Sequence, residues 1–160
     1  MAHFFMTWHA QPLPEYTLPD GFSIRTYRPG DEADWLRCCT GCELGVESWT
    51  DGQFERDMLQ RAGITPESIF FVTDSTSRIA ATATAICQEK HGYVHMVASD
   101  PAYRGKTLGK AVCHVVMRYL VDKGYDTIVL ETDDWRVPAI RVYQWLGFGR
   151  DAPADSPTQE

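Results

Sequence analysis

The chain has 160 residues, of which 44% are hydrophobic and 23% are charged, an ordinary composition for one globular domain. A chain of this length buries about two-thirds of its unfolded surface. The formal net charge of −7 argues against broad nucleic-acid binding and mildly favours a cationic small molecule as partner. No apolar run reaches transmembrane length, so we expect no membrane partner.

The first 20 residues include Pro12, Pro14 and Pro19 and are predicted to form an irregular leader. They lack a basic region followed by an apolar stretch, so they do not resemble a signal peptide, and we expect a cytoplasmic location. The five cysteines are an odd number, which fits reduced thiols in that compartment.

Strands and helices alternate over residues 21–150. Phe22 to Tyr27 alternates as a strand, and Arg28 to Asp31 opens a helix around Trp35. Three cysteines at the end of this helix, Cys38, Cys39 and Cys42, suggest a metal site. Zinc usually takes four ligands, however, and no second Cys-x-x-Cys or His pair has matching spacing. We predict no metal site and expect these cysteines to pack as small apolar residues.

A second helix is predicted from Thr50 to about Ala62. Thr50 and Gln53 form a capping box, and Trp49 and Phe54 are placed to form a hydrophobic staple. Three strands are predicted after it, at Ile69–Thr73, Ile79–Cys87 and Tyr93–Ser99. The middle strand alternates Ala and Thr, which lets neighbouring elements pack close.

The junction between the last of these strands and the following helix has the features of an anion site. The N–H groups of a first helical turn lack intrahelical partners, and the helix dipole is positive at that end. Arg104, Lys106 and Lys110 add charge, while Gly105 and Gly109 keep side chains away from a phosphate. The helix has an apolar stripe of Leu108, Ala111, Val112, Val115, Val116, Tyr119 and Leu120.

The sequence from Gly105 to Thr107 resembles the end of a P-loop. That motif also needs a glycine where this chain has Asp100, whose carboxylate would repel phosphates. A P-loop is therefore excluded. The chain continues with a predicted strand, Thr127–Thr132, and a helix, Val137–Leu146. Residues 151–160 are predicted to be a disordered tail.

Two segments resemble the GNAT superfamily of N-acetyltransferases. The pyrophosphate-binding loop of that family reads Arg or Gln, two residues, Gly, one residue, then Gly or Ala. The stretch from Arg104 to Gly109 matches at both ends and carries Thr107 in place of the middle glycine. The segment from Pro138 to Phe148 resembles the second motif, preceded by Arg136 where many members carry Asn.

The resemblance implies an α/β (α+β) fold over residues 21–150. Its central sheet is mixed and mostly antiparallel and is flanked by helices, and its C-terminal strand or strands are short or missing here. It also implies acetyl-CoA as cosubstrate, with pantetheine inserted beside the Tyr93–Ser99 strand, and no metal. The implied coenzyme-binding residues are Val97, Ala98, Ser99, Arg104, Gly105, Lys106, Thr107, Leu108, Gly109, Lys110, Arg136 and Tyr143.

The same resemblance suggests catalytic residues. Tyr143 would protonate the departing thiolate of coenzyme A, or it is a core aromatic residue. His95 would be the general base, or it is a hydrogen-bonded core histidine. By the two-residue strand period, it should share one face with Tyr93, Val97 and Ser99.

Three acidic residues follow the Thr127–Thr132 strand or lie within it. Glu131, Asp133 and Asp134 could attract the acceptor amine or relay its proton, and Glu131 and Asp133 are the predicted substrate-binding residues. The alternative is a solvated acidic turn that caps the last helix, an alternative that applies most to Asp133 and Asp134. For Arg136 the sequence leaves three partners open: a phosphate, an acceptor carboxylate or the neighbouring acids.

Two functions remain from the sequence. The first is an N-acetyltransferase acting on a primary amine of a small molecule or peptide, and the second is a non-catalytic acyl-CoA-binding or sensing module. Thr107 and the short C-terminus keep the second alternative open. A homodimer, in which a partner subunit completes the short C-terminal end, is a further option.

Overall fold

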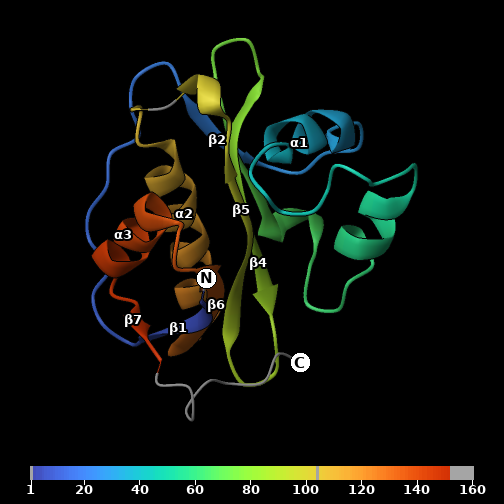
Figure 1. Cartoon of the computed structure of the whole chain (residues 1–160). Helices are drawn as coiled ribbons and strands as arrows, with labels where there is room; N and C mark the ends of the chain where they lie inside the picture. Colours follow the sequence, from blue (N-terminus) through green and yellow to red (C-terminus); the bar gives the residue numbers. More distant parts are fainter. Residues whose placement is uncertain (1, 104, 152–160) are drawn as a thin grey trace.

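The computed structural model describes residues 2–103 and 105–151 and contains one seven-stranded sheet with the order β2-β3-β4-β5-β6-β1-β7 (Figure 1). Neighbouring strands are antiparallel except β5 and β6. This confirms the mixed, mostly antiparallel sheet predicted from the sequence. The strands are β1 (His3–His9), β2 (Ser23–Thr26), β3 (Ile69–Thr73), β4 (Ile79–Cys87), β5 (Gly92–Ser99), β6 (Thr127–Asp133) and β7 (Gly149–Arg150).

Helices cover both faces of the sheet (Figure 1). One face carries α2 and α3, and the other carries α1 and the short π-helix η1. Their bounds are α1 (Glu32–Cys39), η1 (Glu55–Leu59), α2 (Leu108–Asp122) and α3 (Val137–Leu146), and two short 3₁₀ turns are η2 (Pro66–Ser68) and η3 (Pro101–Tyr103). The two layers enclose two sets of buried residues, which we call the α2-side core and the α1-side core.

The predicted apolar stripe of α2 is the face that packs on β3, β4 and β5. Its five most buried members are at most 2% exposed. Burial of a Val or Leu side chain stabilises the fold by roughly 1.5–3 kcal/mol. Both α1 and α2 contact β4, because the small side chains of that strand let each helix approach. The buried members of the stripe are Leu108, Ala111, Val112, Val116 and Leu120.

The α1-side core contains the cysteines at the end of α1. Cys38 and Cys39 are fully buried there, which confirms that they pack as small apolar residues. Burial raises the pKa of the Cys38 thiol to about 12. These thiols are therefore protonated at neutral pH and unreactive.

The second predicted helix is much shorter than expected. Only the segment around Glu55–Leu59 is helical, and it is closed by an i→i+5 bond from the N–H of Gln60 to the carbonyl of Glu55 at 2.8 Å. Gly52, with φ of 82°, makes a turn where the helix was predicted to begin. Half of the predicted capping box is present, since the N–H of Thr50 donates to Gln53 Oε1 at 3.3 Å.

The prediction of an irregular leader is wrong for residues 3–9. These residues form β1, which pairs with β6 from His3 opposite Asp133 to His9 opposite Thr127. Met6 and Trp8 are each 1% exposed in the α2-side core, and burial of these two large side chains stabilises the strand.

The N-terminal strand completes the sheet beyond β6, where the sequence suggested a missing strand. The C-terminal strand β7 has two residues and pairs with β1, as a short final strand was predicted. The rest of the leader runs along α2 and α3 (Figure 1), where Pro14 accepts a hydrogen bond from His114 and Tyr16 lies against Trp145. Most of the predicted tail, residues 152–160, lies outside the described residues.

Candidate active site

Strands β5 and β6, in the middle of the seven-stranded sheet, pair over a short stretch only, and we call the place where they separate the opening. The parallel pairing joins Gly92 to Ile128 and Tyr93 to Val129, and within the described residues it goes no further. Strand β6 continues to Asp133 and pairs with β1 on its other edge throughout, whereas β5 beyond Tyr93 has no pairing with β6 in the described part of the chain, so the two strands diverge there. The predicted pantetheine residues Val97, Ala98 and Ser99 lie along the diverging part of β5.

A β-bulge lies in the same stretch of β5. Met96 and Val97 together lie opposite the single residue Ala83 of β4, and Met96 adopts a left-handed conformation with φ of 53°. Non-glycine residues in this region are uncommon and often occur at functional sites. The bulge lies in the part of β5 that has already left β6, and bulges bend the strand that carries them.

The bulge also reverses the alternation of side chains along β5. Tyr93 and Ala98 belong to the α1-side core, whereas Val97 packs against the α2-side core. The prediction that alternate side chains from Tyr93 to Ser99 share one face is therefore wrong beyond the bulge, because the extra residue shifts the two-residue period by one.

The start of α2 has the geometry expected of an anion site. Thr107, the residue before the helix, has φ of 59°, and Gly105 has φ of 83°. A Cβ placed on Gly109 would meet nothing within 4 Å, so the space beside the first turn is open. Leu108 contributes only its backbone there, since its side chain is in the core, and the ammonium of Lys110 lies 4.4 Å from the centre of the Trp145 ring. Arg104 lies outside the described residues.

The segment before this loop is anchored by Asp100. Its carboxylate accepts a hydrogen bond from the Ala102 N–H at 2.9 Å and is paired with Arg37 and Arg78. Burial acts to raise the pKa of Asp100, but the Ala102 N–H and the Arg37 guanidinium outweigh it and lower the pKa. The carboxylate thus stays charged and fixes the end of β5 to α1 and β4.

Tyr143 is buried in α3 on the α2 side of the opening. It is 5% exposed and packs edge-to-face on Phe148, with ring centroids 6.1 Å apart. Burial raises the pKa of the Tyr143 phenol, so its proton is present at neutral pH.

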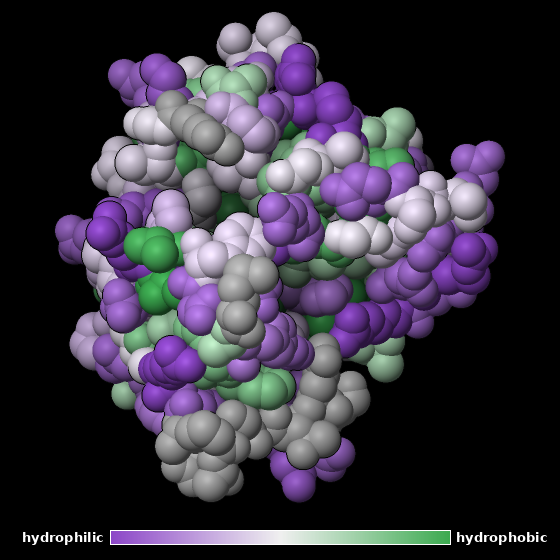
Figure 2. Space-filling model, in the orientation of Figure 1, coloured by the Kyte–Doolittle hydropathy of each residue, from purple (hydrophilic) through white to green (hydrophobic). Residues whose placement is uncertain are grey.

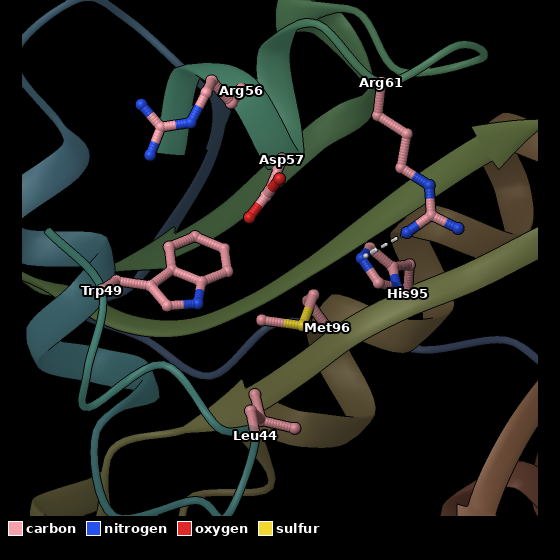
Figure 3. Close-up of a pocket in the computed structure, with 7 residues that line it drawn as sticks. All are labelled: Leu44, Trp49, Arg56, Asp57, Arg61, His95 and Met96. Carbon is pink, nitrogen blue, oxygen red and sulfur yellow. Dashed lines mark hydrogen bonds between the residues drawn. The ribbon is translucent and has the colours of Figure 1, made fainter. Parts of the chain in front are cut away.

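A cavity of about 380 Å³ lies on the α1 side of β5. In Figure 3, Arg61 extends toward His95, and Asp57 points toward the space between Trp49 and His95. Figure 2 shows hydrophilic residues along the right-hand edge of the molecule, where η1 lies in Figure 1. The lining residues are Leu44 and Trp49 from the loop after α1, Arg56, Asp57 and Arg61 in and after η1, and His95 and Met96 from β5.

His95 therefore lies in a cavity, but its neighbours make it a weak base. The Nη1 atom of Arg61 is 3.4 Å from His95 Nε2. Burial, and then the positive charge of Arg61, lower the pKa of His95 to about 4. The imidazole is neutral at neutral pH and has a low affinity for a further proton.

Glu131 lies on β6 on the same side of the sheet. Its Oε1 atom accepts a hydrogen bond from the Tyr93 hydroxyl at 2.7 Å, and its Oε2 atom is 2.5 Å from Nε2 of His3. The other ring nitrogen of His3 is 2.9 Å from Asp133 Oδ1. Because both ring nitrogens of His3 face carboxylates, the hydrogen bonds to Glu131 and Asp133 raise its pKa.

The burial of Glu131 acts to raise the pKa of its carboxyl group, but the hydrogen bonds from His3 and Tyr93 lower it. Glu131 is therefore a carboxylate at neutral pH. The structure thus brings Glu131 and Asp133 together through His3, as part of one hydrogen-bonded chain that begins at Tyr93.

Arg136 binds a loop of the protein. Its guanidinium donates to the carbonyls of Cys42 at 3.0 Å and Glu43 at 2.9 Å, and Nε lies 3.7 Å from Asp133 Oδ2. Of the three partners that the sequence left open for Arg136, the structure shows the neighbouring acid, Asp133. The two backbone carbonyl groups were not predicted. Arg136 ties the loop after α1, which lines the cavity, to the turn between β6 and α3.

Sequence reasoning missed His3, Trp49 and Arg61 as site residues. His3 reaches Glu131 across strands separated by 128 positions in the sequence, so no local pattern connects them. A usable signal was the alternation of Phe4, Met6 and Trp8, which is typical of a half-buried strand.

Comparisons with known proteins agree with this geometry. The sequence profile of the Acetyltransferase (GNAT) family matches residues 31–148. A mycothiol acetyltransferase from Thermomonospora curvata is 32% identical over 145 residues, which cover 88% of this chain and 48% of the relative. The chain thus spans about half the length of the curated relatives it matches.

Solved structures have the same fold. A GCN5-related N-acetyltransferase from Sphaerobacter thermophilus superimposes with a TM-score of 0.74 at 22% identity, covering 93% of this chain and 48% of that one. The ribosomal-protein-S18-alanine N-acetyltransferase from Escherichia coli gives a TM-score of 0.65 at 21% identity, covering 82% of this chain and 79% of that one. Because the family profile matches most of the chain, residues 31–148, the chain belongs to the GNAT acetyltransferase family.

Proposed function

We propose that this chain transfers the acetyl group of acetyl-CoA to a primary amine of a small molecule or peptide by direct attack. The observation that carries the proposal is the opening between β5 and β6. The open first turn of α2 follows the end of β5, and the cavity lies on the α1 side of β5. The two substrates would therefore approach the opening from different sides.

The coenzyme would lie along the diverging part of β5. Its pyrophosphate would accept hydrogen bonds from the amides between Gly105 and Lys110, as anions do at helix N-termini. Pantetheine would pair with the β5 backbone beyond Tyr93 in the manner of an added strand. A backbone N–H near the bulge would then polarise the thioester carbonyl.

The amine nitrogen would attack the thioester carbon, forming the new C–N bond as the C–S bond breaks. Tyr143 would give its phenolic proton to the thiolate. The amine proton would pass to Glu131, directly or through water, because the negative charge of this carboxylate also stabilises the positive charge that develops on the attacking nitrogen, whereas Arg61 places a positive charge 3.4 Å from His95. This assigns the base to Glu131 and leaves His95 as a neutral group beside the acceptor.

The test is release of free coenzyme A thiol from acetyl-CoA in the presence of a panel of amines. We expect release with at least one amine, and Glu131→Gln to lose more kcat/KM than His95→Asn. The converse order would give the role of base to His95. Tight coenzyme binding without thiol release for any amine would support the acyl-CoA-binding alternative instead.

A further inference from the structure

The cavity beside His95 has a charge that the composition of the chain does not suggest. Its lining contains two guanidinium groups, Arg56 and Arg61, and one carboxylate, Asp57, while His95 is neutral at neutral pH. The lining is thus positive by one charge in a chain whose formal net charge is −7. A local excess of one sign in a cavity attracts ligands of the opposite sign.

Arg61 lies where it can act on a bound acceptor. It is half-buried, and its guanidinium extends toward His95 at the β5 side of the cavity (Figure 3). Its Nη1 atom lies 3.4 Å from His95 Nε2, and its charge adds to burial in lowering the pKa of His95, so Arg61 acts on a group that lines the cavity. A planar guanidinium binds carboxylate and phosphate oxygens well, since it offers paired donors.

The other walls of the cavity limit the size and polarity of the acceptor. Leu44, Trp49 and Met96 form an apolar side opposite the η1 residues (Figure 3). The volume of about 380 Å³ is at the lower end of the range of roughly 300–1,000 Å³ for small-molecule pockets. This space holds a small molecule or one terminal residue, and its apolar wall suits a hydrocarbon portion of that group.

Asp57 gives the cavity a second sign of charge. Its carboxylate accepts a hydrogen bond from the Gln53 amide at 3.2 Å and points toward the cavity, apart from the Arg56 guanidinium (Figure 3). Two cationic side chains and one carboxylate match a ligand that carries one anionic group and one ammonium group. An ammonium alone would be repelled by Arg61.

We infer that the acceptor is a small amine that also carries an anionic oxygen group, a carboxylate or a phosphate, held by Arg61 and Arg56. This inference rests on the proposed acetyl transfer and names the substrate class for the same site. It replaces the expectation, drawn from net charge, of a cationic partner. Polyamines and other polycations are poor acceptors in this assignment, because they would bring further positive charge to Arg61.

The test compares acceptors that differ only in the anionic group. Phenylalanine is paired with phenylalaninamide, and O-phosphoethanolamine with ethanolamine, so that the two arms separate a carboxylate from a phosphate. Spermidine serves as the polycation. Thiol release from acetyl-CoA gives kcat/KM. Each value is calculated from the concentration of unprotonated amine, because the amino groups of the acid and the amide have different pKa values. We expect at least one anionic member to exceed its partner about tenfold or more.

Variants then assign the preference to the cavity. Arg61→Gln should remove most of the preference, so that kcat/KM for the anionic acceptor comes close to that for its neutral partner measured with the same variant. Arg61→Lys should retain part of it, and Arg56→Gln should have a smaller effect because Arg56 is exposed. Arg118→Gln, at an exposed position on α2 on the other face, is the matched control and should change neither acceptor.

Calorimetric binding of the same probes to the coenzyme-bound protein separates the two proposals. Binding of an anionic probe that depends on Arg61, without thiol release, would refute acetyl transfer and retain the anion-binding cavity. Two results would refute the anionic acceptor and retain acetyl transfer. One is thiol release with equal kcat/KM for acids and amides, and the other is a preference that survives Arg61→Gln in a folded variant. Preferred acetylation of spermidine would also refute it.

Discussion

The two sides of the β5–β6 opening, which we propose bind the coenzyme and the acceptor, are built in different ways. On the coenzyme side, the loop from Gly105 to Lys110 is one continuous segment that offers mainly backbone groups. On the acceptor side, the cavity takes side chains from the loop after α1, from η1 and from β5, and the adjacent Glu131 is held by a residue of β1. A site made of local backbone leaves a motif in the sequence, whereas a site made of distant side chains does not.

The largest effect should come from Tyr143, the proposed proton donor. Tyr143→Phe keeps the ring and its packing on Phe148 but removes the proton donor. We expect kcat to fall by about 100-fold, the scale for losing a general acid, with coenzyme affinity unchanged. Single-turnover kinetics should accompany the steady-state assay, since chemistry has to limit the measured rate. A normal single-turnover rate would make Tyr143 a packing residue.

The next largest effect should isolate the coenzyme side. Gly109→Leu should raise the Kd for acetyl-CoA about tenfold, which is ~1.4 kcal/mol, because the new side chain would fill the open space at the first turn of α2. The protein itself accommodates the substitution, since a Cβ there meets nothing within 4 Å. Gly149→Leu, at a similarly open glycine on β7, is the control and should bind normally. Normal coenzyme binding by the Gly109 variant would place the pyrophosphate elsewhere.

The same contrast explains what the sequence could predict. The apolar stripe of α2, the strand at β5 and the helix at α3 follow from local periodicity, and all three are present. The bulge at Met96 was not predicted, because the left-handed conformation falls on a residue with no intrinsic preference for it. Sequence periodicity assigns a side chain to a face only while the register is regular.

The position of β1 shows a second limit. Residues 3–9 have an alternating pattern, but their partner β6 begins at Thr127, so the pairing that makes them a strand is entirely non-local. Glu131 and His95, the candidates for the acceptor site, were named from residue type and from their place on a strand. Their pKa directions depended on Arg61 and His3, which only the folded chain brings near.

A smaller effect should isolate the acceptor side. Arg136→Gln removes charged hydrogen bonds to the carbonyls of Cys42 and Glu43, so the loop that carries Leu44 and Trp49 should lose order. A cost of about 1 kcal/mol would raise the acceptor KM about fivefold while coenzyme affinity stays the same. Arg141→Gln, at an exposed position on α3, should leave KM unchanged. A change in coenzyme Kd instead would indicate that Arg136 contacts the coenzyme.

The smallest effect should come from His3, which joins the N-terminal strand to the acidic end of β6. Its pKa is raised in the folded state by hydrogen bonds to Glu131 and Asp133. A histidine whose pKa is higher in the folded state than in the unfolded state stabilises the fold when it is protonated. This stabilisation is complete below the unfolded pKa of about 6.5 and is lost as the pH rises through the folded pKa. His3→Gln should therefore lower the free energy of unfolding more at about pH 5.5 than at about pH 9.

The size of this effect is limited by exposure. The His3 side chain is 55% exposed, so water screens its ion pairs and the difference should stay below about 1 kcal/mol. Urea unfolding at the two pH values measures it, and His9→Gln at the opposite end of β1 controls for loss of any imidazole from the strand. Equal destabilisation by His3→Gln at both pH values would show that the histidine acts by strand packing alone, and the lowered pKa of Glu131 would then come from the Tyr93 hydroxyl.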